Sequence, residues 1–373
     1  MRILALEPYY GGSHQAFLDG WAAQSRYEWT LLTLPAHKWK WRMRHAPVTF
    51  AEQVAARAAG GEQWDAVFCS DMLDLAAFLG LAGGSIARPP AVAYFHENQL
   101  TYPARHDEPR DRHFAFTNFT TALAARAVWF NSTFHRDAFL GALDGFLARM
   151  PDHQPLGSVE ALRARSEVLP PGIAPLPPRP ARPPGPLRIL WAARWEYDKG
   201  AEAFFEALGL LAGRGVDFRL SVIGQQFRDV PAAFARARRA WAGRIDRWGH
   251  QARRADYVSA LGEADVFVST AEHEFFGISA VEAVAAGAYP VLPDRLAYPE
   301  VLGAIAGDRA GAFLYDGTPG GLADRLADLA GRRAADALWP GRTDLSRSAQ
   351  ACFGWARAAG RLDDALERTV RPG

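Results

Sequence analysis

Runs of apolar residues alternate with stretches of helical periodicity along the chain. In the first half, short apolar runs predict buried strands at residues 3–6, 30–34, 66–69, 91–95 and 128–130. In the second half, the same rhythm predicts strands at residues 187–192, 218–223, 266–269 and 290–292, and helices after Lys199, Pro231, Ile278 and Pro319. Alternating strands and helices are typical of parallel βα units, so the pattern predicts an α/β fold with two Rossmann-like domains that face a central cleft.

A proline-dense tract at residues 170–186 separates the two halves. Proline cannot donate to a strand ladder or continue a helix, so we expect a semi-extended linker here. The expected organisation is an N-terminal domain at 1–169, the linker at 170–186, a C-terminal domain at 187–345, and a helical segment at 346–373 that packs back across the domains. A chain of 373 residues is also longer than one hydrophobic core usually serves.

Composition narrows the functional classes. The chain has 42 Lys and Arg against 41 Asp and Glu, which excludes a wholly basic nucleic-acid coat and makes any polyanion site local. Two cysteines are too few for a disulfide scaffold or a zinc site and fit a reducing compartment. The N-terminal apolar stretch is too short for a signal peptide, and the longest uncharged stretch, residues 75–87, is too short to span a bilayer. We therefore expect a cytoplasmic protein with no membrane partner.

A glycine pair, Gly11 and Gly12, follows the first predicted strand and precedes a helical pattern at residues 15–23. Glycines at this position let backbone N–H groups approach a phosphate at the positive end of a helix. The alternative is a simple tight turn in which Ser13 caps the helix. The pair does not match G-x-G-x-x-G, the fingerprint of dinucleotide-binding domains, so the sequence does not indicate a nicotinamide-dependent hydride transfer.

Arg194 and Lys199 come directly after the first strand of the second half. An arginine fork and a lysine point charge at the carboxyl end of a strand can neutralise a diphosphate. The alternative is a surface ion cluster with Glu196 and Asp198. The chain has only three lysines, Lys38, Lys40 and Lys199, which favours a specific use of this one.

Glu274 and Glu282 flank the predicted start of a helix that follows a buried strand. Phe276, Gly277 and Ile278 lie between them, where the first N–H groups of a helix have no intrahelical partner. Two carboxylates at this spacing can bind separate hydroxyl-bearing parts of one ligand. The alternative is an acidic residue that complements the helix dipole and a second one that is merely solvated.

These motifs resemble those of retaining GT-B glycosyltransferases of the GT4 type. The resemblance rests on the E-x7-E pattern of Glu274 and Glu282, the pair Arg194 and Lys199, and the Gly11–Gly12 pair. It implies that Glu282 binds the nucleotide ribose, that Glu274 binds the transferred sugar, and that the two cations bind the diphosphate.

A narrower resemblance covers most of the chain. The strings EPYYGGSH (7–14), LPAHKWKWRMR (34–44), YFHENQLTYP (94–103), RWEYDKG (194–200) and HEFFGISAVEAVAAGAYPVLP (273–293) are similar to those of the tRNA-queuosine α-mannosyltransferase family. The resemblance implies transfer of mannose from GDP-mannose to queuosine at the anticodon wobble position of tRNA-Asp.

Residues 37–45 interleave basic and aromatic side chains, a composition that binds a phosphate backbone and stacks bases. The alternative is a hydrophobic strand with charged edges. The candidate tRNA contacts in this segment are Lys38, Trp39, Lys40, Trp41, Arg42 and Arg44.

His96, Glu97 and Asn98 follow the strand that ends at Phe95, at a strand end where α/β proteins bind ligands. We expect His96 to contact the sugar or the acceptor, and His14, Glu97 and Asn98 to contact the acceptor; a structural histidine is the alternative. Asp71, Asn131 and Ser132 hold similar positions and are weaker candidates, since such side chains often cap helices.

No Asp-x-Asp pair occurs in the sequence, so we expect metal-independent chemistry without a cofactor. Arg194, Lys199 and the amides near Gly11, Gly12 and Gly277 would stabilise the departing diphosphate. With no evident carboxylate nucleophile, retention implies front-face attack by analogy with the fold, and no general base is assigned. The alternatives are a glycosyltransferase with a lipid or small-glycan acceptor, an NDP-sugar epimerase on the same scaffold, and an inactive RNA-binding protein.

Overall fold

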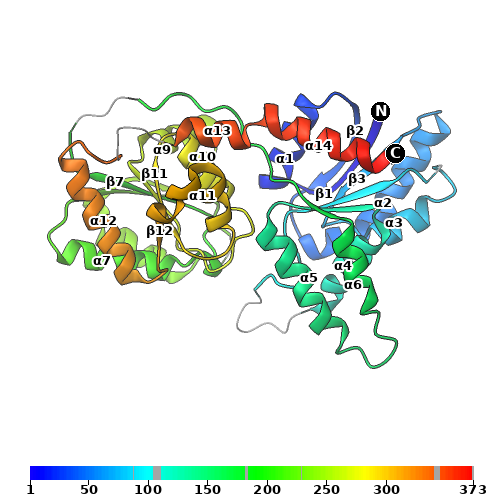
Figure 1. The fold of residues 1–373 in the computed structure, drawn as a ribbon, viewed down its shortest axis with the longest axis horizontal. Helices are drawn as coiled ribbons and strands as arrows, with labels where there is room; N and C mark the ends of the chain where they lie inside the picture. Colours follow the sequence, from blue (N-terminus) through cyan, green and yellow to red (C-terminus); the bar gives the residue numbers. More distant parts are fainter. Residues whose placement is uncertain (87, 104–110, 181–183, 228, 340–344, 372–373) are drawn as a thin grey trace. The chain divides into compact units, whose positions relative to one another are not determined.

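The computed structural model describes residues 1–373 except 87, 104–110, 181–183, 228, 340–344 and 372–373. The chain forms two compact units (Figure 1). The first unit contains Met1–Gly172 and Trp355–Gly373, and the second contains Ile173–Gly354. Each unit is built around one six-stranded sheet.

The sheet of the first unit has the order β2-β1-β3-β4-β5-β6, and its neighbouring strands pair in parallel. All five strands predicted from apolar runs are present. The strands are β1 (Arg2–Tyr10), β2 (Glu28–Pro35), β3 (Ala66–Ser70), β4 (Ala91–Phe95), β5 (Ala127–Phe130) and β6 (Ser166–Val168). The pattern missed β6, because this edge strand of three half-buried residues carries no apolar run.

Helices cover both faces of this sheet. Because side chains alternate across a strand, Leu4 and Leu6 of β1 face one hydrophobic core and Ile3 and Ala5 face the other. The first core also takes residues from α2, α3, α4 and α5, and the second takes residues from α1 and α14. The helices are α1 (Gly12–Gln24), α2 (Trp39–Ala59), α3 (Leu75–Ala82), α4 (Arg112–Ala124), α5 (Thr133–Leu147), α6 (Gly157–Ala164) and α14 (Trp355–Val370).

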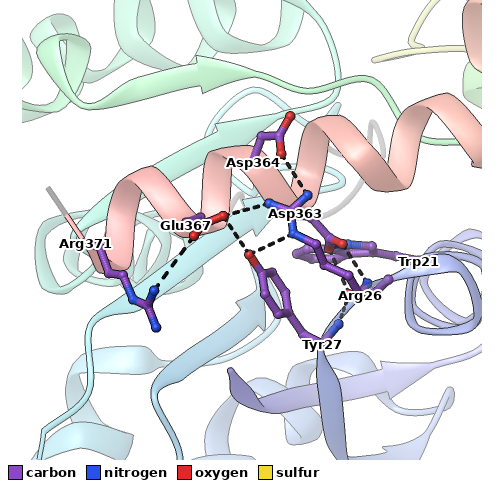
Figure 2. Close-up of polar contacts among 8 residues, drawn as sticks. Trp21, Arg26, Tyr27, Asp363, Asp364, Glu367 and Arg371 are labelled. Carbon is purple, nitrogen blue, oxygen red and sulfur yellow. Dashed lines mark hydrogen bonds and ion pairs between the residues drawn. The ribbon is translucent and has the colours of Figure 1, made fainter. Parts of the chain in front are cut away.

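The C-terminal helix α14 completes the first unit, where it lies along α1 (Figure 1). Its Trp355 ring packs so closely that a Cβ added at Gly20 would lie 2.1 Å from the ring, and one added at Gly172 would lie 2.3 Å from it. Figure 2 shows the polar side of this contact. The buried Asp363 carboxylate accepts hydrogen bonds from Trp21 Nε1, Ser25 Oγ and the backbone N–H of Arg26, each at 2.8 Å.

The helical segment expected near residues 346–369 consists of two helices that belong to different units. Helix α13 (Ser346–Phe353) packs on the second unit, and α14 begins at Trp355. The break falls at Gly354, whose extended backbone ends the helical conformation.

The sheet of the second unit has the order β12-β11-β10-β7-β8-β9, again with parallel neighbours. The predicted strands are present, whereas the edge strands β9 and β12 were missed because they are short or half exposed. The strands are β7 (Leu187–Ala192), β8 (Phe218–Ile223), β9 (Ile245–Gly249), β10 (Val266–Val268), β11 (Tyr289–Pro293) and β12 (Leu314–Tyr315). The helices are α7 (Ala201–Gly213), α8 (Ala232–Ala240), α9 (Arg254–Glu263), α10 (Ile278–Ala285), α11 (Tyr298–Ala306), α12 (Pro319–Ala334) and α13.

From Ile173 on, the described part of the proline-dense tract belongs to the second unit. Leu176 is buried, and Arg179 donates to the carbonyl of Gly287 and to Asp265 Oδ1, each at 2.8 Å. Residues 181–183 of the expected linker lie outside the described residues.

Strand order indicates where each sheet binds ligands. Numbered from β7 within its own unit, the second sheet runs 6-5-4-1-2-3, the doubly wound dinucleotide-binding order, and the first sheet runs 2-1-3-4-5-6, the flavodoxin-like order. In both orders ligands bind at the carboxyl ends of the strands where the winding reverses. These switch points lie between β1 and β3 in the first unit and between β7 and β10 in the second. Within the described ranges, no helix is both long and apolar enough to cross a membrane.

Candidate active site

Lys199 lies at the switch point of the second sheet, at the end of a 3₁₀ turn (Tyr197–Lys199) that follows β7. Its ammonium group is buried and donates to the carbonyl of His273 at 2.7 Å. It also lies 3.0 Å from Asp198 Oδ2 and 3.6 Å from Glu274 Oε2. We call Asp198, Lys199, His273 and Glu274 the lysine cluster.

Gly200 allows the chain to turn into α7 directly after Lys199. Its φ is +64°, and a Cβ at this position would lie 2.2 Å from the carbonyl oxygen of Thr270. Both the backbone conformation and the lack of space therefore require glycine here. The close approach brings the loop after β7 against the loop after β10, and so brings Lys199 to Glu274.

Glu274 is ionised and partly open. Burial raises the pKa of its carboxyl group, but Lys199, Arg194, His273 and the backbone N–H of Phe276 outweigh burial and lower the pKa below its usual value. The side chain remains 27% exposed. Burial and the charge of Lys199 lower the pKa of His273 to about 4, so its ring is neutral at physiological pH. Glu274 is thus a fixed carboxylate that can accept hydrogen bonds from sugar hydroxyls.

Arg194 is the more accessible cation of the predicted pair. Its side chain is 41% exposed, and its Nε lies 3.2 Å from Glu196 Oε2. Its charge acts on the lysine cluster, where it lowers the pKa of both Glu274 and His273. The structure brings Lys199 and Glu274 together and also includes the ion contacts of Arg194 with Glu196 and of Lys199 with Asp198 that were the alternative.

Helix α10 begins beside this cluster. Gly277 precedes its first residue with a φ of +85°, and a Cβ there would lie 2.8 Å from the ring of Tyr298. The predicted loop residues Phe276 and Ile278 flank this glycine at the N-terminus of the helix, where the helix dipole favours negative charge.

Glu282 is held by a different group of residues. Its carboxylate lies 2.5 Å from Arg254 Nη2 and accepts a hydrogen bond of 2.7 Å from the hydroxyl of Tyr257. Both partners come from α9, and sequence reasoning missed them as a pair. Their i, i+3 spacing places them on one face of α9, but nothing in the sequence shows that this face meets α10. Carboxylate oxygens have further lone pairs, so Glu282 can still accept hydroxyl groups.

In the first unit, Gly11 and Gly12 connect β1 to α1. Gly11 precedes the helix without a side-chain cap, and a Cβ there would lie 2.5 Å from Ala36 Cβ. Gly12 is exposed, and its φ of +55° favours glycine. The helix begins at Gly12, so Ser13 lies inside α1 and does not cap it.

Three polar side chains gather beside this turn, which we call the histidine cluster: Glu7, His14 and His96. His14 Nδ1 lies 3.2 Å from Glu7 Oε2, and the rings of His14 and His96 are in contact at a tilt of 38°, with centroids 4.1 Å apart. Each residue offers one ligand-type atom within 4.8 Å of the others. The hydrogen-bonded Glu7–His14 pair and the contact between the two imidazole rings account for this grouping, so we do not assign a metal to it.

The loop that carries His96, Glu97 and Asn98 is fixed by buried polar groups from neighbouring strand ends. Asp71 Oδ1 accepts from the N–H of His96 at 2.8 Å, and Asn131 Nδ2 donates to its carbonyl at 2.9 Å. Asn98 is fully buried, and its Oδ1 accepts from the N–H of Thr101 at 2.8 Å, so Asn98 shapes the loop. Glu97 is half-buried and accepts from Gln99 Nε2. Ser132 caps α5, as the alternative for that residue predicted.

The basic and aromatic residues 38–44 begin helix α2 and do not form a strand. Trp41 is 60% exposed, and Lys38, Lys40 and Arg44 are exposed. Trp39 is half-buried and packs against Phe114. Arg42 differs from its neighbours because it is buried and donates to the carbonyl of Pro35 at 3.0 Å, so it holds the start of the helix.

Known structures show the class of protein. Sucrose-phosphate synthase from Thermosynechococcus elongatus has a TM-score of 0.68 with 16% identity and covers 99% of both chains. Anabaena HepE in complex with UDP-glucose has a TM-score of 0.65 with 17% identity over 98% of this chain and 99% of that one. With its two parallel six-stranded sheets, the chain therefore has the GT-B glycosyltransferase fold, as predicted.

Sequence comparison shows the family within that class. Residues 2–173 match the model of the tRNA-queuosine alpha-mannosyltransferase N-terminal domain, and residues 186–332 match glycosyl transferases group 1. The tRNA-queuosine alpha-mannosyltransferase of Drosophila melanogaster is 32% identical over 311 residues, which are 80% of this chain and 81% of that protein. A GDP-mannose-dependent alpha-(1-6)-phosphatidylinositol dimannoside mannosyltransferase of Mycobacterium tuberculosis is 28% identical over 47% of this chain and 42% of that protein. The chain belongs to the tRNA-queuosine alpha-mannosyltransferase family, and the resemblance expected from its motifs is confirmed.

Proposed function

We propose that this protein is a retaining glycosyltransferase that moves mannose from GDP-mannose to the queuosine of tRNA-Asp. The observation that carries the proposal is the lysine cluster, in which Lys199 lies 3.6 Å from Glu274 at the switch point of the second sheet. Mannosyl transfer to queuosine is the activity named for the Drosophila relative, and GDP-mannose is the donor named for the mycobacterial one.

On the donor side, Arg194 binds the diphosphate and Lys199 stabilises its growing negative charge as the sugar bond breaks. Glu274 accepts hydrogen bonds from the transferred sugar, and Glu282, held by α9, accepts those of the ribose. The amides near Phe276, Gly277 and Ile278 add N–H donors at the start of α10. The fixed cations serve in place of a metal ion, so no metal or other cofactor takes part.

On the acceptor side, His96 contacts a reacting hydroxyl, and His14, Glu97 and Asn98 shape its surroundings. The exposed residues at the start of α2, Lys38, Lys40, Trp41 and Arg44, contact the tRNA, with basic groups on phosphates and the tryptophan on a base. Trp39 and Arg42 support that surface from below, because Trp39 is half-buried and Arg42 is buried. A tRNA substrate fits a cytoplasmic enzyme without a membrane partner.

The test is mass spectrometry of nucleosides from queuosine-containing tRNA after incubation with the protein and a panel of nucleotide sugars. We expect queuosine to gain one hexose with GDP-mannose and not with UDP-glucose, UDP-galactose or GDP-glucose. Parallel reactions with phosphatidylinositol mannosides and with tRNA that lacks queuosine define the acceptor. Mannosylation of the lipid without modification of the tRNA would replace the proposed acceptor with a lipid.

A further inference from the structure

His96 is fixed in place, yet its ring nitrogens make no hydrogen bond to the part of the chain that the structure describes. Its backbone is held on both sides, by Asp71 at the N–H and by Asn131 at the carbonyl. Asn131 is held in turn, because His135 Nδ1 lies 2.9 Å from its Oδ1. The ring is only half-buried. A histidine that is anchored at its backbone and open at its nitrogens is arranged to meet a group from outside the protein.

The orientation of the His96 ring is set by three other rings. The His14 ring packs against it in a tilted contact, with centroids 4.1 Å apart and an interplanar angle of 38°. Phe17 meets it edge-on at 5.0 Å, and Tyr94 lies 4.7 Å away. Of these three neighbours, only His14 can carry a charge near neutral pH. The state of His14 therefore acts directly on His96.

Glu7 determines the state of His14. The Glu7 carboxylate is buried and fully engaged, since Oε1 accepts from Ser70 Oγ at 3.0 Å and from the N–H of Tyr9 at 2.8 Å while Oε2 faces His14. Burial lowers the pKa of His14, but Glu7, and then Asp71 and Glu97, outweigh burial and raise it to about 9. His14 is therefore an imidazolium at neutral pH, held between a carboxylate and the ring of His96.

We propose that Glu7 and His14 are positioning residues for His96: the buried carboxylate holds a charged ring against the His96 ring and so keeps that imidazole neutral and oriented toward a substrate hydroxyl. The inference rests on the proposed function, because it assigns the hydroxyl to the sugar donor or to the acceptor. A neutral imidazole can accept a hydrogen bond from a hydroxyl, whereas an imidazolium only donates.

The electrostatic surroundings of His96 agree with this role. Burial, and then the charges of His14 and His135, lower the pKa of His96 well below its usual value. The other charged groups around it are Glu7 on β1, Asp71 after β3 and Glu97 in the same loop. Burial raises the pKa of Asp71, and His14 opposes that rise. Removing the charge of His14 therefore raises the pKa of His96 toward its ordinary value of about 6.5.

The first measurement does not depend on any reaction. In protein labelled with ¹⁵N-histidine, the His96 ring is assigned as the signal that is lost in His96→Gln and is followed from pH 5 to pH 8. We expect the His96 ring to be neutral at pH 7 in the wild type and to titrate at a higher pH in His14→Gln and in Glu7→Gln than in the wild type, because burial remains but the charge of His14 is lost. A wild-type ring that is protonated at pH 7, or a titration in both variants that is identical to that of the wild type, would overturn the inference.

The second measurement is the pH dependence of kcat for transfer to tRNA. As the pH falls, His14→Gln and Glu7→Gln should lose activity at a higher pH than the wild type does, because only neutral His96 accepts the hydroxyl and the variants protonate it earlier. Phe17→Leu is the matched control: it removes a ring contact without a charge and should lower kcat equally at every pH. If the titration of His96 shifts as expected but the protein transfers no mannose, the proposed function is refuted and the positioning role is retained. If the protein transfers mannose but the titration of His96 does not shift, the positioning role is refuted and the proposed function is retained.

Discussion

The two units place polar side chains at equivalent switch points, but they present different chemistry there. After β7 and β10, Arg194 pairs with Glu196 and Lys199 pairs with Glu274. The side chains of Arg194 and Glu274 are partly exposed to solvent. After β1 and β4, the charges of Glu7 and His14 are buried and paired, and the group left open is His96, which burial and neighbouring charges keep neutral. One sheet thus offers charge and the other offers an uncharged hydrogen-bonding ring.

This difference separates the effect of topology, which sets where a ligand binds, from that of the side chains, which set which ligand binds. Strand order alone places a ligand site at both reversals of winding. The local pairing then determines whether the site suits a diphosphate, which needs cations, or a hydroxyl, which needs a neutral acceptor. Donor binding in the second unit and acceptor activation in the first unit follow from that division in our proposal.

The largest expected effect is in the second unit, where Lys199→Met removes the cation and keeps the length of the side chain. The leaving diphosphate loses one fixed positive charge, so we expect kcat to fall about 10²–10³-fold. Single-turnover kinetics with GDP-mannose and queuosine-containing tRNA measure the change. Arg214→Met is the matched control, since Arg214 pairs with Asp324 at the surface of the same unit and its loss should leave kcat unchanged. Full activity of Lys199→Met would refute the proposed role of Lys199 in stabilising the leaving diphosphate.

Asp363→Asn tests whether the C-terminal helix belongs to the first unit. The buried carboxylate accepts three hydrogen bonds from Trp21, Ser25 and Arg26, and an amide group in its place satisfies them only in part. We expect the free energy of unfolding of the first unit to fall by on the order of 3 kcal/mol. Hydrogen exchange resolved by segment should show the loss in α1 and α14 and leave the second sheet protected. Asp364→Asn, whose carboxylate is exposed, is the control. Equal loss in both units would contradict the assignment of α14.

Arg254→Met and Tyr257→Phe test the support of Glu282. Each change frees one side of the carboxylate, so we expect the KM for the donor to rise about tenfold while kcat changes little, because ribose binding is shared by ground and transition states. Arg253→Met is the control: Arg253 precedes Arg254 in the chain, is exposed and pairs with Asp256 of α9, so its loss should leave the KM unchanged. A fall in kcat without a change in KM would place Glu282 at the reacting centre instead of the ribose.

The smallest expected effect concerns the tRNA surface at the start of α2. The double variant Trp41→Ala with Arg44→Ala removes one stacking group and one phosphate contact, and tRNA affinity should fall several-fold while GDP affinity is unchanged. The slope of affinity against salt concentration should also decrease by about one unit. Arg42 is left intact, because its buried guanidinium supports the helix. Unchanged tRNA binding across salt concentrations would remove this surface from the proposal.

Much of the fold follows from the sequence, because buried parallel strands are continuous apolar runs. Residues 91–95, 187–192 and 218–223 match their strands without any change of boundary. The missed strands β6, β9 and β12 are edge strands, which are short or half exposed and so carry a weaker apolar signal.

The site was less predictable than the fold. Lys199 and Glu274 are close in space because the loops after β7 and β10 meet at Gly200. The sequence indicates this contact, because both residues follow predicted buried strands and the ends of parallel strands lie at one edge of a sheet. The partners of Glu282 and the anchors of His96 have no such signal. Arg254, Tyr257 and His135 act across helix contacts and hydrogen bonds that only the packed structure defines.

In our proposal, the switch point of the second sheet binds the diphosphate of the donor. Calorimetric titration of GDP into the wild type, Lys199→Met and Arg194→Met, with Arg214→Met as the control, measures this binding without any reaction. We expect Lys199→Met and Arg194→Met each to lose at least about tenfold in GDP affinity, near 1.4 kcal/mol, and the control to keep wild-type affinity. GDP affinity equal to wild type in both Lys199→Met and Arg194→Met would contradict this proposal.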